Sequence, residues 1–312
     1  MNAINNILVI VDPTAEKHPA VDKAALLAQQ LGARLELFVC DTKASREVRL
    51  AAHAGKPADQ PFLVSLKASL EDLARPIRAR GLDVTTEVEC ADPLHAALID
   101  RARRTTADLI VKDTHHHSLF KRTLLTNTDW ELIRACPVPL LLTKTYPWAS
   151  TPKVCAAVDP GHTNDKPAVL DNRIVDHAAL LAKRLAGELH LLHVYLPVAI
   201  VAAAAAGSPP MAITVPAEDL AREAQQRRAM LQDLVSEYRV EPGNVHLEVG
   251  GPAAVLPRAA AELRADIVAM GAISRSGLKR IFIGSTAEDV LEHLPCDALI
   301  VKPPDFASAL PF

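Results

Sequence analysis

The amino-acid sequence contains two copies of one pattern. Residues 108–143 align without a gap onto residues 266–301, at a constant offset of 158 positions. Further upstream, residues 24–37 match residues 178–191 at an offset of 154 positions. A period near half of the chain predicts two copies of one domain rather than a solenoid of short repeats. With 312 residues in total, each copy is large enough to form its own hydrophobic core.

Each copy alternates short apolar runs with segments of helical periodicity. Apolar runs rich in valine and isoleucine are typical of strands buried on both faces of a sheet, and parallel strands need crossover helices between them. The sequence therefore predicts an α/β fold with two tandem domains, each a five-stranded parallel sheet with helices on both faces. The expected strands are residues 4–12, 34–41, 83–90, 108–112 and 138–144, and then 153–159, 188–195, 245–250, 265–270 and 298–302.

The domain boundaries follow from the same pattern. We expect an N-terminal domain over residues 1–145, a linker over 146–152, a C-terminal domain over 153–305 and a tail over 306–312. The linker contains proline and small residues and has no periodicity, which is typical of interdomain segments. Residues 198–215 have no counterpart in the first half. They are apolar but contain Gly207, Pro209 and Pro210, so they cannot form one regular helix.

Composition excludes several classes of protein. The formal net charge of −3 provides no basic excess for binding nucleic acid. No apolar run approaches the roughly 20 residues that a membrane-spanning helix needs, and the N-terminal residues do not resemble a signal peptide. The five cysteines are scattered and have no C-x-x-C spacing, as expected of buried thiols in a reducing compartment. We therefore expect a cytoplasmic protein that binds neither nucleic acid nor membrane.

Several residues of the second half have the chemistry of a nucleotide phosphate site. Ligands of parallel α/β sheets bind at the carboxyl edge of the sheet, where Asp159 ends the first strand. Glycines after the fourth strand let backbone N–H groups approach an anion, and the N-terminus of the next helix supplies further donors. The residues of this loop and helix start are Gly271, Gly277, Gly284, Ser285 and Thr286, with Lys279 and Arg280 adding positive charge.

Helix capping can also account for part of this pattern. Ser285 and Glu288 have the spacing of a capping box, and Thr128 and Glu131 have the same spacing in the first half. Capping accounts for a serine or threonine at this position. It does not account for the glycines of the second half, so the pattern favours a nucleotide site.

Longer stretches resemble the universal stress protein family. They are VIVDP near the N-terminus, DLIVK and TDWELIRACPVP in the first repeat, YPW in the linker, and GSTAEDVLEHLPCDALIVKP near the C-terminus. Both halves resemble the universal stress protein domain, and the whole chain resembles the tandem, E-type members of the family. The resemblance implies an adenine nucleotide alpha hydrolase-like fold and a role in stress adaptation. It also implies that the last strands, residues 138–144 and 298–302, pair edge to edge as an internal pseudo-dimer.

The ATP-binding pattern of this family is glycine, two residues, glycine, nine residues, glycine, and then serine or threonine. In this chain the pattern is Gly271, Ser274, Gly284 and Ser285, so a serine stands at the second glycine position. A serine adds a Cβ atom and disfavours a positive φ angle, although its hydroxyl group can donate to a phosphate.

The resemblance also implies which half binds the nucleotide and with what contacts. By position, the family's adenine contacts fall on Asp159 and Val194. The first half retains Asp12 but matches the glycine pattern nowhere. The resemblance therefore implies that the C-terminal half binds ATP or a related adenine nucleotide, with or without magnesium, and that the first half does not bind it in this way. A homodimer of the full chain is compatible with the sequence.

No catalytic motif accompanies the expected nucleotide site. The sequence has no G-x-S-x-G elbow, no G-x-x-x-x-G-K-[ST] loop and no paired catalytic carboxylates. ATP sites without a metal-binding carboxylate and a water-positioning group hydrolyse ATP poorly. We therefore expect binding without efficient catalysis. A slow ATPase is one alternative, and a nucleotide-free protein that binds a partner or an apolar ligand through residues 198–215 is another.

Three consecutive histidines stand where the first half would hold phosphate. Three consecutive side chains can point in different directions, so at most two of His115, His116 and His117 would easily share one metal ion. No pair of histidines at helical spacing supports a catalytic zinc site. We expect a solvated loop whose charge responds to pH, and no metal site.

Overall fold

The structure, a computed structural model, describes residues 3–42, 61–117, 122–161, 168–205, 215–238, 240–272, 285–304 and 306. The elements of the N-terminal half are β1 (Asn6–Ile10), α1 (Pro19–Leu31), β2 (Arg34–Cys40), α3 (Pro61–Arg78), β3 (Val84–Glu89), α4 (Leu94–Arg104), β4 (Leu109–Asp113), β5 (His115–His117), β6 (Arg122–Leu124), α5 (Asn127–Ala135) and β7 (Leu140–Thr143). Those of the C-terminal half are β8 (Lys153–Ala157), α6 (Ala168–Arg184), β9 (Glu188–Tyr195), α7 (Val198–Ala205), α8 (Ala217–Leu234), a 3₁₀ turn (Pro242–Asn244), β10 (Val245–Val249), α9 (Pro252–Leu263), β11 (Ile267–Gly271), α10 (Ser285–His293) and β12 (Asp297–Val301).

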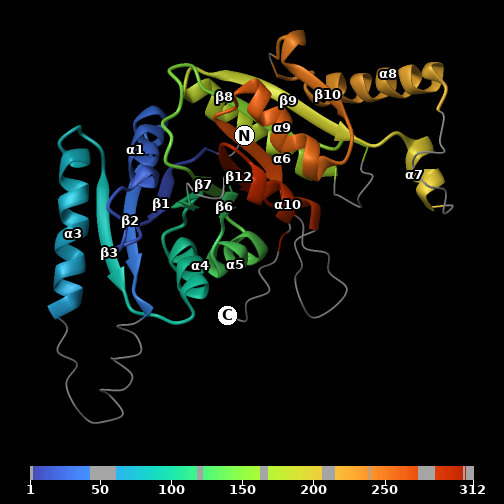
Figure 1. Ribbon diagram of the computed structural model, residues 1–312. Coiled ribbons are helices and arrows are strands. Elements are labelled where there is room, and N and C mark those ends of the chain that lie inside the picture. Colours follow the sequence, from blue (N-terminus) through green and yellow to red (C-terminus); the bar gives the residue numbers. More distant parts are fainter. Residues whose placement is uncertain are drawn as a thin grey trace.

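One continuous ten-stranded sheet runs through both halves (Figure 1). Its strand order is β10-β9-β8-β11-β12-β7-β4-β1-β2-β3. Neighbours within each half are parallel, whereas β12 and β7 pair antiparallel, with Leu299 opposite Leu141. Each half therefore contributes a five-stranded parallel sheet, which confirms the predicted fold class. The antiparallel pair also confirms the expected contact between the last strands of the two halves.

Helices cover both faces of this sheet. The core on one face includes α1, α3, α6 and α8, and the core on the other includes α4, α5, α9 and α10 (Figure 1). Successive side chains of a strand point to opposite faces. In β1, Ile7 and Val9 accordingly belong to the first core, whereas Leu8 and Ile10 belong to the second. Each core contains residues of both halves, so the hydrophobic interior is continuous across the seam between β7 and β12.

The histidine run forms a strand rather than the predicted loop. His115–His117 is β5, which pairs antiparallel with β6 and places His116 opposite Thr123. The prediction of a loop was therefore wrong. The hairpin satisfies backbone N–H and C=O groups of both segments. Its existence could not be read from the composition, because histidine is not among the residues that favour strands.

The cap of α5 lies two residues before the predicted one. Thr126 Oγ1 accepts a hydrogen bond from the N–H of Asp129 at 3.2 Å, and the Asp129 carboxylate accepts one from the N–H of Thr126 at 2.7 Å. This reciprocal pair is a capping box. The prediction that Thr128 and Glu131 form the box was wrong, because an aspartate at this spacing reaches the cap as well as the glutamate of the usual motif.

The apolar segment that is specific to the second half begins as a helix. α7 lies at the periphery of the molecule, beyond the carboxyl end of β9 (Figure 1). Leu196, Val198 and Val201 are 42%, 62% and 50% exposed. The glycine and prolines predicted to interrupt the segment lie outside the described residues. Among the helices that the structure describes, none combines the length and apolar character needed to cross a membrane.

A buried ion pair joins the two halves beside the seam. The Lys23 ammonium on α1 lies 2.7 Å from Asp297 Oδ2 at the start of β12. The Asp297 carboxylate also accepts hydrogen bonds from the N–H of Lys144 and from the indole N–H of Trp148, both at 2.8 Å. Asp297 is 2% exposed. Burial raises the pKa of Asp297, and the adjacent Lys23 opposes that rise. One carboxylate thus connects α1, the end of β7, the linker and β12.

Removing one member of this pair leaves the other buried without its partner. We expect Asp297→Asn and Lys23→Met each to lower the free energy of unfolding by about 3 kcal/mol, and the double variant to lose clearly less than the sum. Urea unfolding followed by circular dichroism measures these values. The control is Asp72→Asn, which breaks an exposed pair with Arg75 and is expected to cost less than about 1 kcal/mol. Strictly additive losses would contradict the coupling.

Candidate functional site

The carboxyl ends of three neighbouring strands meet at one edge of the C-terminal sheet. The register pairs β8 with β9 on one side and with β11 on the other. Asp159 follows the end of β8, Val194 lies near the end of β9, and Gly271 ends β11. Three predicted site residues therefore lie at the same edge. The strand order reverses between β8 and β11, and ligands of open parallel sheets bind at such a switch point.

The first turn of α6 reaches this edge. The N–H of Asp159 donates a hydrogen bond to Asp171 Oδ1 at 3.1 Å. Asp171 is buried and stands in the first turn of α6, where the helix dipole favours a negative charge. This contact holds the main chain as it leaves β8. Asp171 was not among the residues singled out in the sequence, where nothing marked it as part of the first turn of α6.

Packing accounts for the missing side chain of Gly271. A Cβ atom at this position would lie 2.8 Å from Leu170 Cδ2 and 3.3 Å from Ile174 Cδ1. Both residues belong to α6, so the glycine lets this helix lie close against β11. The sequence analysis attributed the glycine to the approach of an anion to the main chain. That role stays a prediction.

Most of the predicted phosphate loop lies outside the described residues. Ser274, Gly277 and Gly284 fall within residues 273–284, which the structure does not describe. Ser285 is the first residue of α10, and Thr286 is exposed in the first turn of that helix. A capping box formed with Glu288 requires the serine to precede the helix, so the start of α10 at Ser285 does not confirm that interpretation.

The equivalent edge of the first half is filled by its own charged side chains. Lys112 Nζ lies 2.8 Å from Oδ1 of the buried Asp129. Asp113 Oδ1 accepts hydrogen bonds from the N–H of Ala20 at 2.8 Å and from the Thr143 hydroxyl at 2.7 Å. Partial burial raises the pKa of Asp113. Two carboxylates and one ammonium therefore occupy the end of β4 and the start of α5.

The second half cannot build this arrangement. At the constant offset of 158 positions, the counterparts of Lys112, Asp113, Thr126 and Asp129 are Met270, Gly271, Gly284 and Ala287. None of these four side chains carries a charge or an oxygen. The two halves thus share a fold and differ in the charge of one edge.

A second polar group lies beside Val194 and was missed in the sequence. His193 Nδ1 lies 2.9 Å from the carbonyl oxygen of Val158, and His193 Nε2 lies 3.2 Å from the Arg227 guanidinium. A carbonyl oxygen only accepts, so Nδ1 carries the proton and Nε2 accepts from Arg227. Burial lowers the pKa of His193, which favours this neutral form. Arg227 in turn forms a 2.7 Å ion pair with Glu223.

Lys302 holds the main chain where it leaves β11. Its ammonium donates a hydrogen bond to the carbonyl oxygen of Ala272 at 2.8 Å and lies 4.6 Å from the centre of the Phe306 ring. Lys302 is buried, and this burial lowers its pKa to about 8. The ammonium therefore fixes the first residue after Gly271.

Among the described residues, no group of three or more histidine, cysteine, aspartate or glutamate side chains is arranged to hold a metal ion.

A model of the universal stress protein family matches residues 3–144 and 153–302. Universal stress protein E of Salmonella typhi is 28% identical over 314 residues, which cover 98% of this chain and 96% of the relative. The Escherichia coli K12 protein of the same name gives the same identity and coverage.

Solved structures agree with these sequence comparisons. A Pseudomonas aeruginosa PAO1 protein described as functionally unknown is 29% identical, with a TM-score of 0.74 over 97% of this chain and 94% of its own. A universal stress protein from Archaeoglobus fulgidus shares the fold at 18% identity, with a TM-score of 0.67 over 96% of this chain and 99% of its own. The resemblance noted in the sequence, tandem E-type members included, is thereby confirmed.

The packing role of Gly271 predicts a dependence on Leu170. We expect Gly271→Ala to lower the free energy of unfolding by about 1 to 3 kcal/mol, because the new methyl group overlaps the Leu170 side chain. In a Leu170→Ala background the same substitution should cost clearly less, since the Leu170 atoms are gone and only the 3.3 Å contact with Ile174 remains. Denaturant unfolding of the four proteins measures both steps. An equal cost in the two backgrounds would show that Leu170 is not the constraint.

The lowered pKa of Lys302 predicts a pH-dependent contribution to stability. Below pH 8 the amine is protonated in both states, and the folded protein carries the full cost of a buried charge. Between pH 8 and about 10.5 only the unfolded state keeps the proton, so stability rises with pH. Relative to Lys302→Met, the native protein should gain up to about 3 kcal/mol across this window. Unfolding of both proteins at several pH values measures the difference, and a flat difference would contradict the assignment.

Proposed function

We propose that this chain, which belongs to the universal stress protein family, binds ATP or a related adenine nucleotide at the carboxyl edge of its C-terminal sheet. The observation that carries the proposal is the contrast between the two halves. The first half fills this edge with the Lys112–Asp129 pair and with Asp113. The second half has uncharged residues at the same positions, so no ion pair of this kind competes there with the phosphates of a ligand.

The start of α10 supports the proposal. In α5 the first turn is closed by oxygens of Thr126 and Asp129. The counterparts of these residues, Gly284 and Ala287, have no side-chain oxygen. The first N–H groups of α10 therefore lack the cap that closes α5, and such groups bind phosphate together with the helix dipole. In the proposed complex the phosphates lie against this helix end and the residues before it. The helix end contributes Ser285 and Thr286, and the preceding residues are Gly271, Ser274, Gly277 and Gly284.

Two further residues supply the contacts to the nucleoside. Asp159 presents a carboxylate next to the switch point, where it can accept hydrogen bonds from a ribose hydroxyl or the adenine amine. Val194 is half-buried near the end of β9 and offers an apolar surface to the base. Magnesium, where present, would accompany the phosphates of the nucleotide.

The proposed activity is binding without efficient turnover. His193 directly precedes Val194 on β9. Both of its ring nitrogens are engaged in hydrogen bonds, one with the Val158 carbonyl oxygen and one with Arg227. It is therefore not placed to accept a proton from a water molecule. A role in adaptation to stress follows from the family, with the bound nucleotide as its ligand.

An aspartate introduced at position 287 tests the site directly. Ala287→Asp copies Asp129 of the first half and places a carboxylate in the first turn of α10. The helix dipole favours this charge, so the fold should persist, while repulsion should weaken ATP binding at least about tenfold. Isothermal titration with Mg-ATP measures the dissociation constant. The control is Ala261→Asp, which adds the same charge at an exposed position of α9 and should leave binding unchanged.

Three outcomes would count against the proposed site or against nucleotide binding itself. The first is unchanged affinity in Ala287→Asp, and the second is no binding by the native protein up to millimolar Mg-ATP. The third is the absence of nucleotide from protein that is purified from cells, denatured and analysed by mass spectrometry. In the latter two cases the exposed apolar residues of α7, Val198 and Val201, favour a nucleotide-free role in binding a partner or an apolar ligand.

A further inference from the structure

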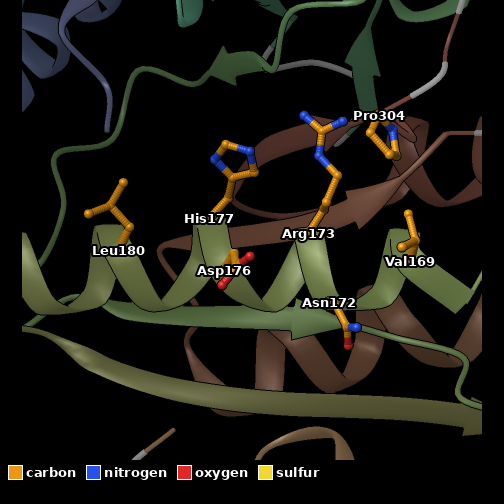
Figure 2. A pocket seen from close by; sticks show the side chains of 7 residues that line it. All are labelled: Val169, Asn172, Arg173, Asp176, His177, Leu180 and Pro304. Carbon is orange, nitrogen blue, oxygen red and sulfur yellow. The ribbon is translucent and has the colours of Figure 1, made fainter. Parts of the chain in front are cut away.

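A cavity lies along α6, and none of the residues proposed to bind the nucleotide lines it. Its volume is about 420 Å³, within the usual range for sites that bind small molecules. All of its lining residues except Pro304 come from α6, and Pro304 closes the groove (Figure 2). The lining residues are Val169, Asn172, Arg173, Asp176, His177, Leu180 and Pro304.

Two nitrogen-bearing side chains point into this groove together. Figure 2 shows Arg173 and His177 leaving α6 on the side where Pro304 lies, while Asp176 leaves the helix in another direction. The Asp176 carboxylate accepts a hydrogen bond from the Tyr238 hydroxyl at 2.5 Å. Among the described residues, Arg173 has no ion pair and His177 no hydrogen bond. The groove therefore presents a half-buried guanidinium and an imidazole to whatever occupies it.

The internal repeat shows what this position does in the other half. At the offset of 154 positions, His177 is the counterpart of Lys23, whose ammonium is held by the Asp297 carboxylate. The residue that corresponds to Asp297 in the first half is Pro139, at the offset of 158. Both halves thus have a nitrogen-bearing side chain at this position, Lys23 and His177. Only Lys23 has a carboxylate at the facing position, because the counterpart of Asp297 is Pro139. The position that corresponds to Asp297 therefore offers no carboxylate to His177.

We propose that this groove binds a small monocarboxylate with an apolar chain, whose carboxylate group contacts Arg173 and His177. The guanidinium offers two parallel N–H donors to a carboxylate, and the imidazole can donate a third. Val169, Leu180 and Pro304 provide the apolar surface for the chain.

The charge of the groove argues against a polyanion such as a nucleotide. Burial, with help from the nearby Arg173, lowers the pKa of His177 to about 4, so the imidazole is neutral near pH 7. Arg173 is then the single cationic side chain among the lining residues, and Asp176 adds a negative charge beside it. The groove therefore has one guanidinium for a ligand carboxylate, and Asp176 already offsets part of its charge. Several phosphates would be left without counter-charges.

Titration of the full chain with octanoate tests the proposal. We expect saturable binding at one site by isothermal titration, weakened tenfold or more in Arg173→Gln because the charged hydrogen bonds are lost. Val169→Glu, a change at an exposed residue of the groove, should weaken binding similarly by repelling the carboxylate. Arg184→Gln removes an equal charge from an exposed position near the end of α6 and should bind as the native chain does.

The titrations distinguish a monocarboxylate site from a general anion site and from the nucleotide edge. Equal affinity in all four proteins, or no saturation by the native chain, would overturn the proposal. If inorganic phosphate displaces bound octanoate at concentrations similar to those at which octanoate binds, the assignment to a monocarboxylate is overturned. Mg-ATP affinity should be unchanged in Arg173→Gln, because the groove is distinct from the nucleotide edge. A loss of ATP binding in that variant would show that the two regions form one site.

Discussion

The Asp297 carboxylate is the contact on which the joint between the two halves depends. The antiparallel pairing of β7 with β12 includes only three residue pairs, so the strands alone form a short seam. The carboxylate strengthens this seam by accepting hydrogen bonds from α1, from the main chain after β7 and from the indole of the linker. Lys23 and Asp297 are 274 residues apart. Their contact therefore forms only when α1 of the first half and β12 of the second have come together.

Within that shared frame, the two halves differ in how they treat the same edge. In the first half, Asp129 would repel a phosphate and already occupies Lys112 as its ion-pair partner. In the second half, Met270 and Ala287 remove both members of that pair at once. Loss of one member alone would leave a buried charge without a counter-charge. The paired change therefore removes the ion pair without leaving either charge buried alone.

The sequence was most informative where a pattern extends over many residues. The repeat, the alternation of apolar runs with helices and the carboxyl edge follow from periodicity, and the structure has the same order of strands. The pairing of the last strands came from the family resemblance, since no periodicity distinguishes an edge strand that meets its copy. The capping box between Thr126 and Asp129 was visible in the sequence and was assigned to the wrong residues.

Side-chain partners that are distant in the sequence could not be predicted. His193 and Arg227 are 34 residues apart, and nothing in either segment indicates that they meet. Gly271 shows a different limit, because a glycine can serve a ligand or a neighbouring helix and its sequence context looks the same. The Leu170 side chain at 2.8 Å identifies the helix as one cause, which only the packing of α6 could reveal.

The polar group around His193 connects the proposed nucleotide edge to the segment that is specific to the second half. The ring links the Val158 carbonyl, one residue before Asp159, to Arg227 on α8. Glu223, the ion-pair partner of Arg227, accepts a hydrogen bond from the N–H of Val198, the first residue of α7, at 3.2 Å. Because each member is held by the next, a displacement of the main chain at the end of β8 strains the contact that holds α7. The exposed apolar helix and the proposed nucleotide edge therefore belong to one hydrogen-bonded assembly.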